Sequence, residues 1–466
     1  MKKEEKNDLM EKIVSLCKRR GFVFPGSEIY GGFAGTYDFG HYGVELRRNI
    51  IDAWTSSMND HDNIALLDSS IFTVAKVWEA SGHVAGFSDP LVACLNCHTK
   101  YRADHLLEAI DVRADEKMTE AEINKVFDAN RDKLKCSNCG KKDFGPVRAK
   151  KMLATSTLGM MEEGDQEVYL RAETAQGIYI NYHNILDAGF YSVPFGIAQV
   201  GKVFRIEISP RQFLFRLREF EQMEMQYFVH PRDAGTIYEE WKKERMAYYE
   251  KLGIRKEKLR WKQHDKLVFY AKDAWDIEYE FPFGWGEVEG IHYRGDYDLT
   301  QHQKFSGVDM SAIDEETKEK FIPHVIETSV GVDRTFLMLM AEAYIEDEMN
   351  GEKRTSLRFV PNMAPVKMAV FPLLKNKPEL VAKAREVYLF LRKNLRGLIK
   401  FDDNGNIGKR YRRQDEIGTP YCITIDFDTL GENPDLLDTV TVRDRDTGGQ
   451  QRMKIEELVE FFKSKK

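Results

Sequence analysis

Long apolar runs, glycine-rich phosphate loops and abundant cysteine are all missing from this sequence of 466 residues. No stretch approaches the length of a membrane-spanning helix, and the charged N-terminus lacks the apolar core and cleavage site of a secretory signal. Neither GxGxxG nor GxxxxGKS/T occurs, so the dinucleotide and P-loop fingerprints are excluded. Six cysteines, four of them in CxxC pairs, do not suit a secreted disulfide framework. We expect a cytoplasmic protein with no membrane partner.

The overall composition indicates packed globular domains. Apolar residues make up 42% and aromatic residues 12% of the chain, and its length predicts two or three domains. The net charge of −7 does not exclude a nucleic-acid partner, because binding depends on local patches.

The most charged and aromatic stretch, VFRIEISPRQFLFRLREFEQMEMQYFV, runs from Val203 to Val229. Its alternation predicts two strands with a connection that begins at Ile208–Arg211, and it places Arg205 and Glu207 on one face. Planar guanidinium forks close to carboxylates and rings suit a polyphosphate. The pattern favours a nucleotide-binding hairpin over a solvated charged one. The charged segment from Arg232 to Lys258, which follows it, is expected to be a solvated helix.

Two CxxC knuckles bracket a polar, helix-like segment. Cys94, Cys97, Cys136 and Cys139 supply four thiolates for a tetrahedral structural zinc, with no position left open for catalysis. The alternative is two unrelated reduced pairs.

Three further segments carry weaker signals. Arg171 and Glu173 alternate on a predicted short strand, where an exposed ion pair is the simpler interpretation. Glu287 and Glu289 are predicted to share one strand face, which would suit Mg²⁺ or an ammonium group or form a plain charged edge. Arg334 lies in the first turn of a predicted helix, where the helix dipole disfavours a cation unless an anion binds there.

The pattern changes beyond a predicted linker, Val360–Pro365, to a compact α/β domain. Basic residues are interleaved there with Tyr411 and Tyr421, which suits single-stranded nucleic acid, although a charge run is usually a solvated face. These basic residues are Arg392, Lys393, Arg396, Lys400, Lys409, Arg410, Arg412 and Arg413.

Together these segments resemble the class II aminoacyl-tRNA synthetases, and among them the dimeric glycyl-tRNA synthetases. GGFAGTYDFGHYGVELRRNIIDAW resembles motif 1, the hairpin motif 2, and ETSVGVDRTFLML motif 3. RAETAQG, REFEQMEM and WGEVEG are the more specific segments. Ile206, His41 and Thr328 depart from the residues usual in this family, which puts local geometry in question.

The resemblance implies an α+β fold, with an antiparallel sheet flanked by helices and a C-terminal α/β anticodon-binding domain. It implies a catalytic domain over 1–362, with a cysteine-bearing insertion at 90–165 and a second insertion at 299–321, followed by an anticodon-binding domain over 363–466. It also implies a homodimer through the long motif 1 helix. For that helix, the apolar stripe of Leu46, Ile50, Ile51 and Trp54 by itself favours core packing.

By the same resemblance, ATP is activated with Mg²⁺, and glycine is transferred to the 3′ end of tRNA(Gly). Arg205 and Arg334 are the implied catalytic residues, Phe220 stacks on adenine, and Glu287 is the candidate Mg²⁺ partner. The implied ATP-binding residues are Arg205, Ile206, Glu207, Phe215, Arg216, Leu217, Arg218, Glu219, Phe220, Glu287, Val288, Gly331, Val332, Asp333 and Arg334.

Glycine has no side chain, so its site must exclude a methyl group and hold the ammonium and carboxylate. The resemblance places Glu173, Glu327 and Ser329 at the ammonium and Arg294 at the carboxylate. The implied glycine-binding residues are Arg102, Glu173, Phe220, Glu221, Gln222, Met223, Glu224, Arg294, Glu327, Thr328, Ser329, Val330 and Gly331.

Two alternatives remain. One is a related synthetase for histidine, threonine, proline or serine, which RAETAQG and WGEVEG disfavour. The other is a catalytically silent binding subunit, such as a polymerase accessory factor. That role predicts loss of the phosphate-binding arginines, yet Arg205, Arg218 and Arg334 are present.

Overall fold

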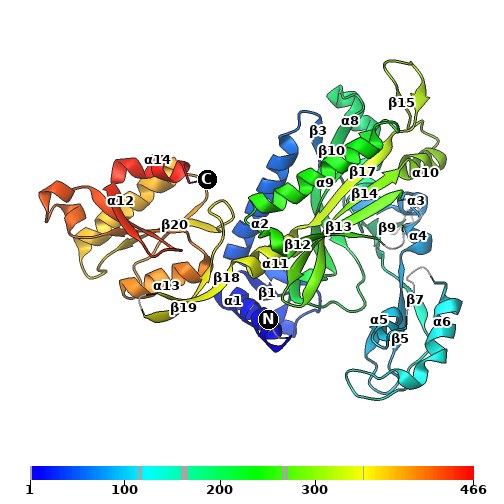
Figure 1. Cartoon of the computed structure of the whole chain (residues 1–466), viewed down its shortest axis with the longest axis horizontal. Coiled ribbons are helices and arrows are strands. Elements are labelled where there is room, and N and C mark those ends of the chain that lie inside the picture. The colour runs from blue at the N-terminus through cyan, green and yellow to red at the C-terminus, as the bar shows by residue number, and fades with distance from the viewer. Residues whose placement is uncertain are drawn as a thin grey trace.

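The protein consists of a large sheet with its helices, a small cysteine-bearing lobe and a C-terminal α/β unit (Figure 1). The structure is a computed structural model that describes residues 3–112, 114, 118–158, 166–264, 267, 271–349 and 351–465. None of the described helices combines the length and apolar character that a membrane span requires.

A seven-stranded sheet forms the centre of the molecule. All neighbouring strands in it are antiparallel except the outer pair of β10 and β3, which are parallel. This confirms the predicted antiparallel sheet flanked by helices. In spatial order the strands are β12 (Leu259–Gln263), β13 (Asp273–Phe281), β14 (Gly284–Gly295), β17 (His324–Gly331), β11 (Glu219–Val229), β10 (Phe195–Phe204) and β3 (Ile64–Leu67).

One face of the sheet is covered by four helices that share its largest apolar core. Leu46, Ile50 and Trp54 recur every fourth residue of α2 and are fully buried, so the predicted stripe is core packing. The prediction of a solvated helix for 232–258 is wrong for one face of α9, because Tyr238 and Trp241 on that face are buried against the sheet. These helices are α1 (Lys3–Arg20), α2 (His41–Asn59), α9 (Ala234–Lys251) and α11 (Val332–Ala343).

Among the residues that the structure describes, helices cover the opposite face at one end. There Tyr179 and Tyr182 pack with Phe195 and Phe228 of the sheet and with Leu299. The rest of this face is polar and forms the site described below. The covering elements are α7 (Ala175–Ile180), α8 (Tyr182–Gly189) and α10 (Tyr297–Ser306), with a three-stranded sheet of β4 (Phe72–Val74), β9 (Gln166–Leu170) and β8 (Ala154–Leu158) and two short helices, α3 (Ala75–Ala80) and α4 (His83–Gly86), beside them.

The cysteine-bearing insertion is a separate lobe, seen at the lower right of Figure 1. It has its own core around Val92, Leu107, Phe127 and Phe144. Thr119 caps the predicted polar helix through a capping box with Glu122. The last predicted residues of this insertion, 159–165, lie outside the described residues. The lobe comprises β5 (Ser88–Ala93), β6 (Lys100–Arg102), α5 (Ala103–Glu108), α6 (Glu120–Ala129) and β7 (Arg148–Lys151).

The C-terminal unit is a five-stranded sheet with helices. Its strand order is β21 (Leu398–Phe401), β20 (Val366–Pro372), β22 (Tyr421–Ile425), β23 (Thr439–Asp444) and β24 (Gln450–Lys454), and its helices are α12 (Pro378–Asn394), α13 (Ile407–Ile417) and α14 (Leu458–Lys463). The remaining hairpins are β1 (Val23–Pro25) with β2 (Tyr37–Phe39), β15 (Ala312–Ile313) with β16 (Lys320–Phe321), and β18 (Tyr344–Met349) with β19 (Glu352–Leu357).

The segment predicted as a linker is packed in place. Met363 and Ala364 are buried, and both of their carbonyls accept hydrogen bonds of 3.1 Å from the Asn49 side chain of α2. Pro361 and Pro365 therefore belong to a segment that is packed against the core, and not to an open linker.

Candidate active site

A cavity of about 240 Å³ opens on the uncovered face of the seven-stranded sheet. It brings together charged residues from segments far apart in the sequence, most of which the sequence had predicted as site residues. Its lining residues are Glu173, Arg205, Glu207, Leu214, Phe215, Arg216, Leu217, Phe220, Gln222, Glu224, Glu287, Gly290, His292, Arg294, Glu327, Ser329, Gly331, Asp333 and Arg334.

Strand alternation explains which predicted residues reach this cavity. Successive side chains of a strand point to opposite faces, so Gln222 and Glu224 of β11 face the cavity while Met223 lies in the core beneath. In β17, Glu327 and Ser329 face the cavity, and Thr328 and Val330 are buried on the other side.

Several predicted residues therefore lie outside the cavity lining. Glu221 forms an ion pair with Arg47 of α2, Glu219 bonds to Lys202 at 2.9 Å, and Val288 and Val332 are buried. Ile206 contributes a backbone hydrogen bond of 2.8 Å to the Met152 carbonyl. Arg218 donates to the Ala34 carbonyl at 2.9 Å and lies over the Phe33 ring, so it holds the loop between β1 and β2 to the hairpin.

Arg102 also lies outside the lining, within the cysteine-bearing lobe. It is 6% exposed and forms ion pairs with Asp89 at 3.0 Å and with Asp104. These contacts attach its guanidinium to the lobe itself.

The hairpin is present, but its strands begin and end elsewhere than predicted. β10 starts at Phe195 and ends at Phe204, and its partner strand β11 begins at Glu219. Arg205 and Glu207 therefore belong to the loop and not to an alternating strand. The Arg205 guanidinium donates to the Ala172 carbonyl at 2.9 Å and lies between the rings of Phe87 and Phe220, at 5.4 and 5.3 Å. These contacts fix a permanent positive charge at the cavity wall.

Arg334 is held at another part of the wall. It pairs with Glu287 at 3.0 Å, donates to the Phe215 carbonyl at 3.1 Å and lies 4.6 Å above the Phe215 ring. It occupies the first turn of α11, as predicted. A guanidinium at a helix N-terminus raises the local positive potential, which suits an anionic ligand.

A bulge separates the two glutamates that were predicted to share a face. The pairing of β13 with β14 shifts between Ile277 and Glu278, so Glu287 and Glu289 fall on opposite sides of the sheet. Glu287 faces the cavity, whereas Glu289 is fully buried against Arg245 at 2.6 Å. The prediction that assumed an unbroken strand is wrong for Glu289.

Arg171 and Glu173 form neither a strand pair nor an exposed pair. β9 ends at Leu170, and the buried Arg171 side chain donates to the carbonyls of Ser69 and Lys202, both at 2.6 Å. Glu173 lies at the cavity, 3.3 Å from His83 and 2.9 Å from the Gln176 amide.

The carboxyl groups of Glu173, Glu224 and Glu327 meet at the deep end of the cavity, and their pKa values are shifted in different directions. Burial and the neighbouring carboxylates of Glu327 and Glu173 raise the pKa of Glu224 well above its ordinary value. Burial opposes ionisation of Glu173, but His83 and Arg294 lower its pKa below the ordinary value. Burial likewise opposes ionisation of Glu327, yet Arg294 and His292 hold its pKa at about 2. Two carboxylates and one neutral acid result, which suits a cationic ligand.

Hydrogen bonds make this deep wall rigid. Gln226 donates to Glu327 at 2.8 Å and accepts from the Tyr179 hydroxyl at 2.7 Å, and the Thr174 amide donates to Glu224 at 3.1 Å. Such a network allows little adjustment to a larger ligand.

Arg294 forms hydrogen bonds to Asp298 and Glu327. Its guanidinium forms two bonds to Asp298, at 2.8 and 2.9 Å, and a third of 2.9 Å to Glu327. This arrangement positions Glu327 and does not favour the predicted role of Arg294 as the receptor for a carboxylate.

The sequence analysis missed three lining residues, Leu214, Gly290 and His292. Gly290 and His292 lie on the same face of β14 as Arg294, so continuing the alternation back from Arg294 would have found them. Burial lowers the pKa of His292, but the carboxylates of Asp276 and Glu327 outweigh this effect and raise it to about 9.

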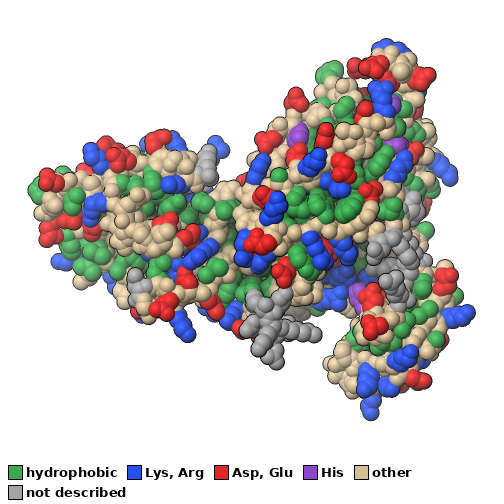
Figure 2. All heavy atoms as spheres, in the orientation of Figure 1, with side chains coloured by type: hydrophobic (Ala, Val, Ile, Leu, Met, Phe, Trp, Pro, Cys, Tyr) green, Lys and Arg blue, Asp and Glu red, His purple; other side chains and the backbone are tan. Residues whose placement is uncertain are grey.

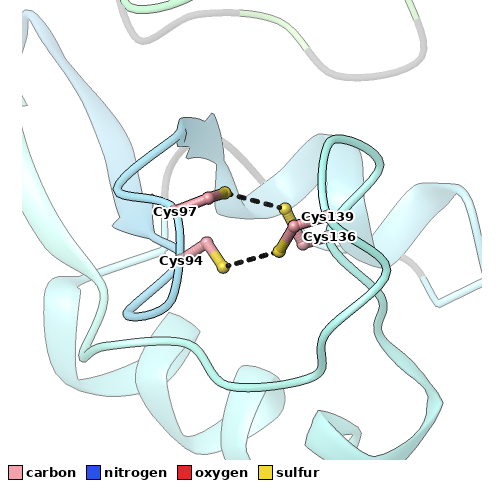
Figure 3. A group of neighbouring side chains, drawn as sticks. All are labelled: Cys94, Cys97, Cys136 and Cys139. Carbon is pink, nitrogen blue, oxygen red and sulfur yellow. Dashed lines mark hydrogen bonds between the residues drawn. The ribbon is translucent and has the colours of Figure 1, made fainter.

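The four knuckle cysteines converge as a metal centre requires (Figure 3). The Sγ atoms of Cys94 and Cys139 are 3.6 Å apart, and those of Cys97 and Cys136 are 3.5 Å apart. Four thiolates about 2.3 Å from a tetrahedral zinc would be about 3.8 Å apart. The donor set and spacing fit a structural Zn²⁺.

Three of the eight residues of the predicted basic patch are engaged within the protein, while Arg392, Lys393, Arg396 and Lys409 are exposed. Arg410 is buried and donates to the carbonyls of Asp403 and Gly405, at 3.0 and 2.7 Å, while Arg412 and Arg413 pair with Glu352 and Asp402. On the face shown in Figure 2, basic, acidic and apolar side chains are mixed over this unit.

Comparison with known protein families gives one match in the region of the seven-stranded sheet and one in the C-terminal unit. A model described as the tRNA synthetase class II core domain (G, H, P, S and T) matches residues 157–343, and one described as the anticodon binding domain matches residues 367–465. The antiparallel sheet and its arginine-lined cavity thus define a class II aminoacyl-tRNA synthetase.

Full-length relatives narrow the assignment. The glycine–tRNA ligase of Chlorobaculum tepidum is 48% identical over 98% of this chain and 100% of its own. That of Clostridium acetobutylicum is 46% identical over 99% of both chains, and that of Borrelia garinii subsp. bavariensis is 48% identical over 98% of this chain and 97% of its own. The chain belongs to the glycine–tRNA ligase family.

Proposed function

We propose that this protein activates glycine with ATP to glycyl-adenylate and transfers the glycyl group to the 3′ end of tRNA(Gly). The observation that carries the proposal is a single cavity with fixed guanidiniums on its wall and two buried carboxylates at its deep end. The guanidiniums suit the phosphates of ATP, and the carboxylates suit an ammonium group. The proposed domain boundaries, 1–362 and 363–466 with insertions at 90–165 and 299–321, assign these steps to the first domain.

The ATP phosphates are proposed to lie beside Arg205. Negative charge develops on the α-phosphate as the glycine carboxylate attacks, and a guanidinium already held by Ala172 and two rings stabilises that charge without reorganising. Phe220 lines the same cavity and offers a face for adenine. Arg334 already lies over Phe215, so it would cover adenine with its other face.

The cavity offers the Glu287 carboxylate to a divalent ion. Mg²⁺ binds through one or two carboxylates together with substrate phosphates, and the partly exposed Glu287 carboxylate faces the cavity beside Arg334. When bound, Mg²⁺ would neutralise phosphate charge. No general base is needed, because the glycine carboxylate is already ionised at neutral pH.

Glycine is proposed to bind at the deep end, with its ammonium between Glu173 and Glu327. Ser329 lines the same wall and accepts a bond of 3.5 Å from Gln222. Because buried, mutually bonded side chains form this wall, a methyl group on the substrate would meet atoms that cannot move aside. The site would therefore select glycine by steric exclusion.

A cytoplasmic homodimer is proposed as the working form. The motif 1 helix stripe is buried, but the loop before it exposes Ile29, Tyr30 and Phe33, at 88%, 87% and 58%. Exposed apolar groups of this kind support a partner surface. Light scattering should give twice the mass of one chain. A monomer at micromolar concentration would remove this part of the proposal.

The activity is tested by charging of tRNA(Gly) with labelled glycine. The protein should charge tRNA(Gly) and leave a tRNA for serine or threonine uncharged. Absence of charging by folded protein that still forms glycyl-adenylate would overturn the transfer step alone.

A further inference from the structure

A second group of metal-ligand side chains lies beside the active-site cavity, outside the cysteine-bearing lobe. His264 directly follows β12, Asp276 lies on β13 and His292 on β14, so three neighbouring strands contribute one residue each. Their ligand atoms all lie within 4.8 Å of one another. Asp276 Oδ1 is 2.9 Å from His264 Nε2 and 4.0 Å from His292 Nε2.

Both imidazole Nε2 atoms are buried, and among the described residues neither has a hydrogen-bond partner. The contact of His292 with Asp276 is too long for a hydrogen bond, and that of His264 has the distance of an ion pair without the geometry of a bond. Buried polar atoms are usually paired. Two buried nitrogens that face one carboxylate without forming a hydrogen bond to it require an explanation.

The other nitrogen of His292 is engaged in the way typical of a metal ligand. Its Nδ1 lies 2.8 Å from Glu327 Oε1, which fixes the ring. With Nδ1–H donating to the carboxylate, Nε2 points toward Asp276, and its lone pair becomes available there when a metal ion displaces the Nε2 proton. Carboxylate–histidine pairs of this kind orient metal-binding imidazoles.

The backbone leaves room at the same point. A Cβ placed on Gly290 would lie 2.9 Å from His292 Nε2 and 3.6 Å from Asp276 Oδ1. Any other residue at position 290 would therefore fill the space in front of these two ligand atoms.

We infer that His264, Asp276 and His292 bind a divalent transition-metal ion, with zinc as the best match to two imidazoles and one carboxylate. Ligands of a tetrahedral zinc lie about 3.4 Å apart, between the two contacts of Asp276. Three protein ligands leave a fourth position for water. This site is separate from the cysteine centre and does not depend on the proposed catalytic roles.

The test is a titration of the metal-free, full-length protein with Co²⁺, followed by absorption. Cobalt on the four cysteines gives an intense thiolate charge-transfer band, whereas cobalt on nitrogen and oxygen ligands gives only weak visible bands. The wild type should bind a second equivalent after the thiolate band is complete. Its visible spectrum should then change without any growth of that band.

Two variants should weaken binding of the second Co²⁺ equivalent for different structural reasons. His264→Asn deletes a ligand, and Gly290→Ala keeps all three ligands but fills the space between them. Each should weaken the second phase by at least about 100-fold and leave the thiolate band unchanged. His183→Asn is the matched control, because His183 is partly exposed and contacts the Asp309 carbonyl at 2.6 Å. It should bind cobalt as the wild type does.

The wild-type titration decides the matter even if a variant fails to fold. Saturation at the cysteine-bound equivalent, with no further spectral change, would overturn the inference and leave the cluster as a protonated histidine held by carboxylates. A second phase that survives unchanged in folded His264→Asn would overturn it equally.

Discussion

At the scale of single residues, the account depends on which buried carboxyl groups carry charge. Glu173 and Glu224 both lie at the cavity, yet their pKa values move in opposite directions. Glu173 is 3.3 Å from His83, whereas Glu224 is surrounded by other acids. Replacing either glutamate by the isosteric glutamine removes the charge and keeps the shape of the side chain.

Glu173→Gln should impair glycine use selectively. Loss of one charge-assisted contact to the ammonium costs about 1.5–3 kcal/mol, which lowers kcat/KM for glycine by about 10- to 100-fold. The KM for ATP should stay near that of the wild type. Pyrophosphate exchange with each substrate varied in turn measures both, with Glu224→Gln as the matched variant at the same cavity. An equal loss for glycine and ATP would contradict the role of Glu173.

Glu224 should make the wild type less stable as pH rises. A carboxyl group whose pKa is raised by folding keeps its proton where the unfolded chain releases it, so stability falls above the ordinary carboxyl pKa of 4.5. The loss is at most about 1.4 kcal/mol per pH unit. Urea unfolding at pH 6 and pH 8 should show a larger loss for the wild type than for Glu224→Gln. The same pH dependence in both proteins would show that Glu224 is ionised when folded.

At the scale of elements, the sequence pattern located the hairpin, the motif 3 helix and the knuckles, because these depend on local alternation and spacing. It failed where long-range pairing decides the outcome. The residues around Glu287 do not indicate the bulge in the pairing of β13 with β14, which places Glu289 beside Arg245. Likewise, the sequence gives no sign that Arg410 is buried, where it donates to the carbonyls of Pro372 on β20 and of Asp403. Regular periodicity predicts faces only while the register is unbroken.

The cysteine-bearing lobe should depend on its metal, while the main sheet should not. Its small core includes Cys94 and Cys136 themselves. Cys136→Ser should abolish zinc binding at this centre and expose the backbone amides of the lobe. Metal analysis and hydrogen exchange measure the two effects. Cys422→Ala, a buried cysteine outside the lobe, should keep the zinc.

Normal protection of the lobe in zinc-free Cys136→Ser would contradict this account. It would show that the apolar contacts of Phe127 and Phe144 suffice to fold the lobe.

At the scale of the whole molecule, a buried ion cluster joins the β18–β19 hairpin to the C-terminal unit. Asp415 of α13 accepts from Arg354 of β19 at 3.0 Å and from Arg443 of β23 at 2.9 Å. The packed segment at Met363 adds a second attachment to α2. The C-terminal unit is therefore held in a defined position.

Asp415→Ala should destabilise the protein by about 3–5 kcal/mol, because the buried Arg443 guanidinium loses its carboxylate partner and Arg354 keeps only its pair with Asp347. Glu352→Ala, which removes a partner from the exposed ion pair with Arg412, should cost less than about 1 kcal/mol. Thermal unfolding compares them. Similar losses in both variants would show that the buried cluster is not what holds the β18–β19 hairpin to the C-terminal unit.

Activation of glycine at this cavity is measured by glycine-dependent exchange of pyrophosphate into ATP. Purified protein should catalyse exchange with glycine and give only background exchange with alanine and serine, because the rigid deep wall excludes a methyl group. Exchange with alanine at a rate comparable to glycine would contradict the steric account. No exchange with any amino acid, in folded protein that binds ATP, would contradict catalysis itself and favour a silent binding subunit.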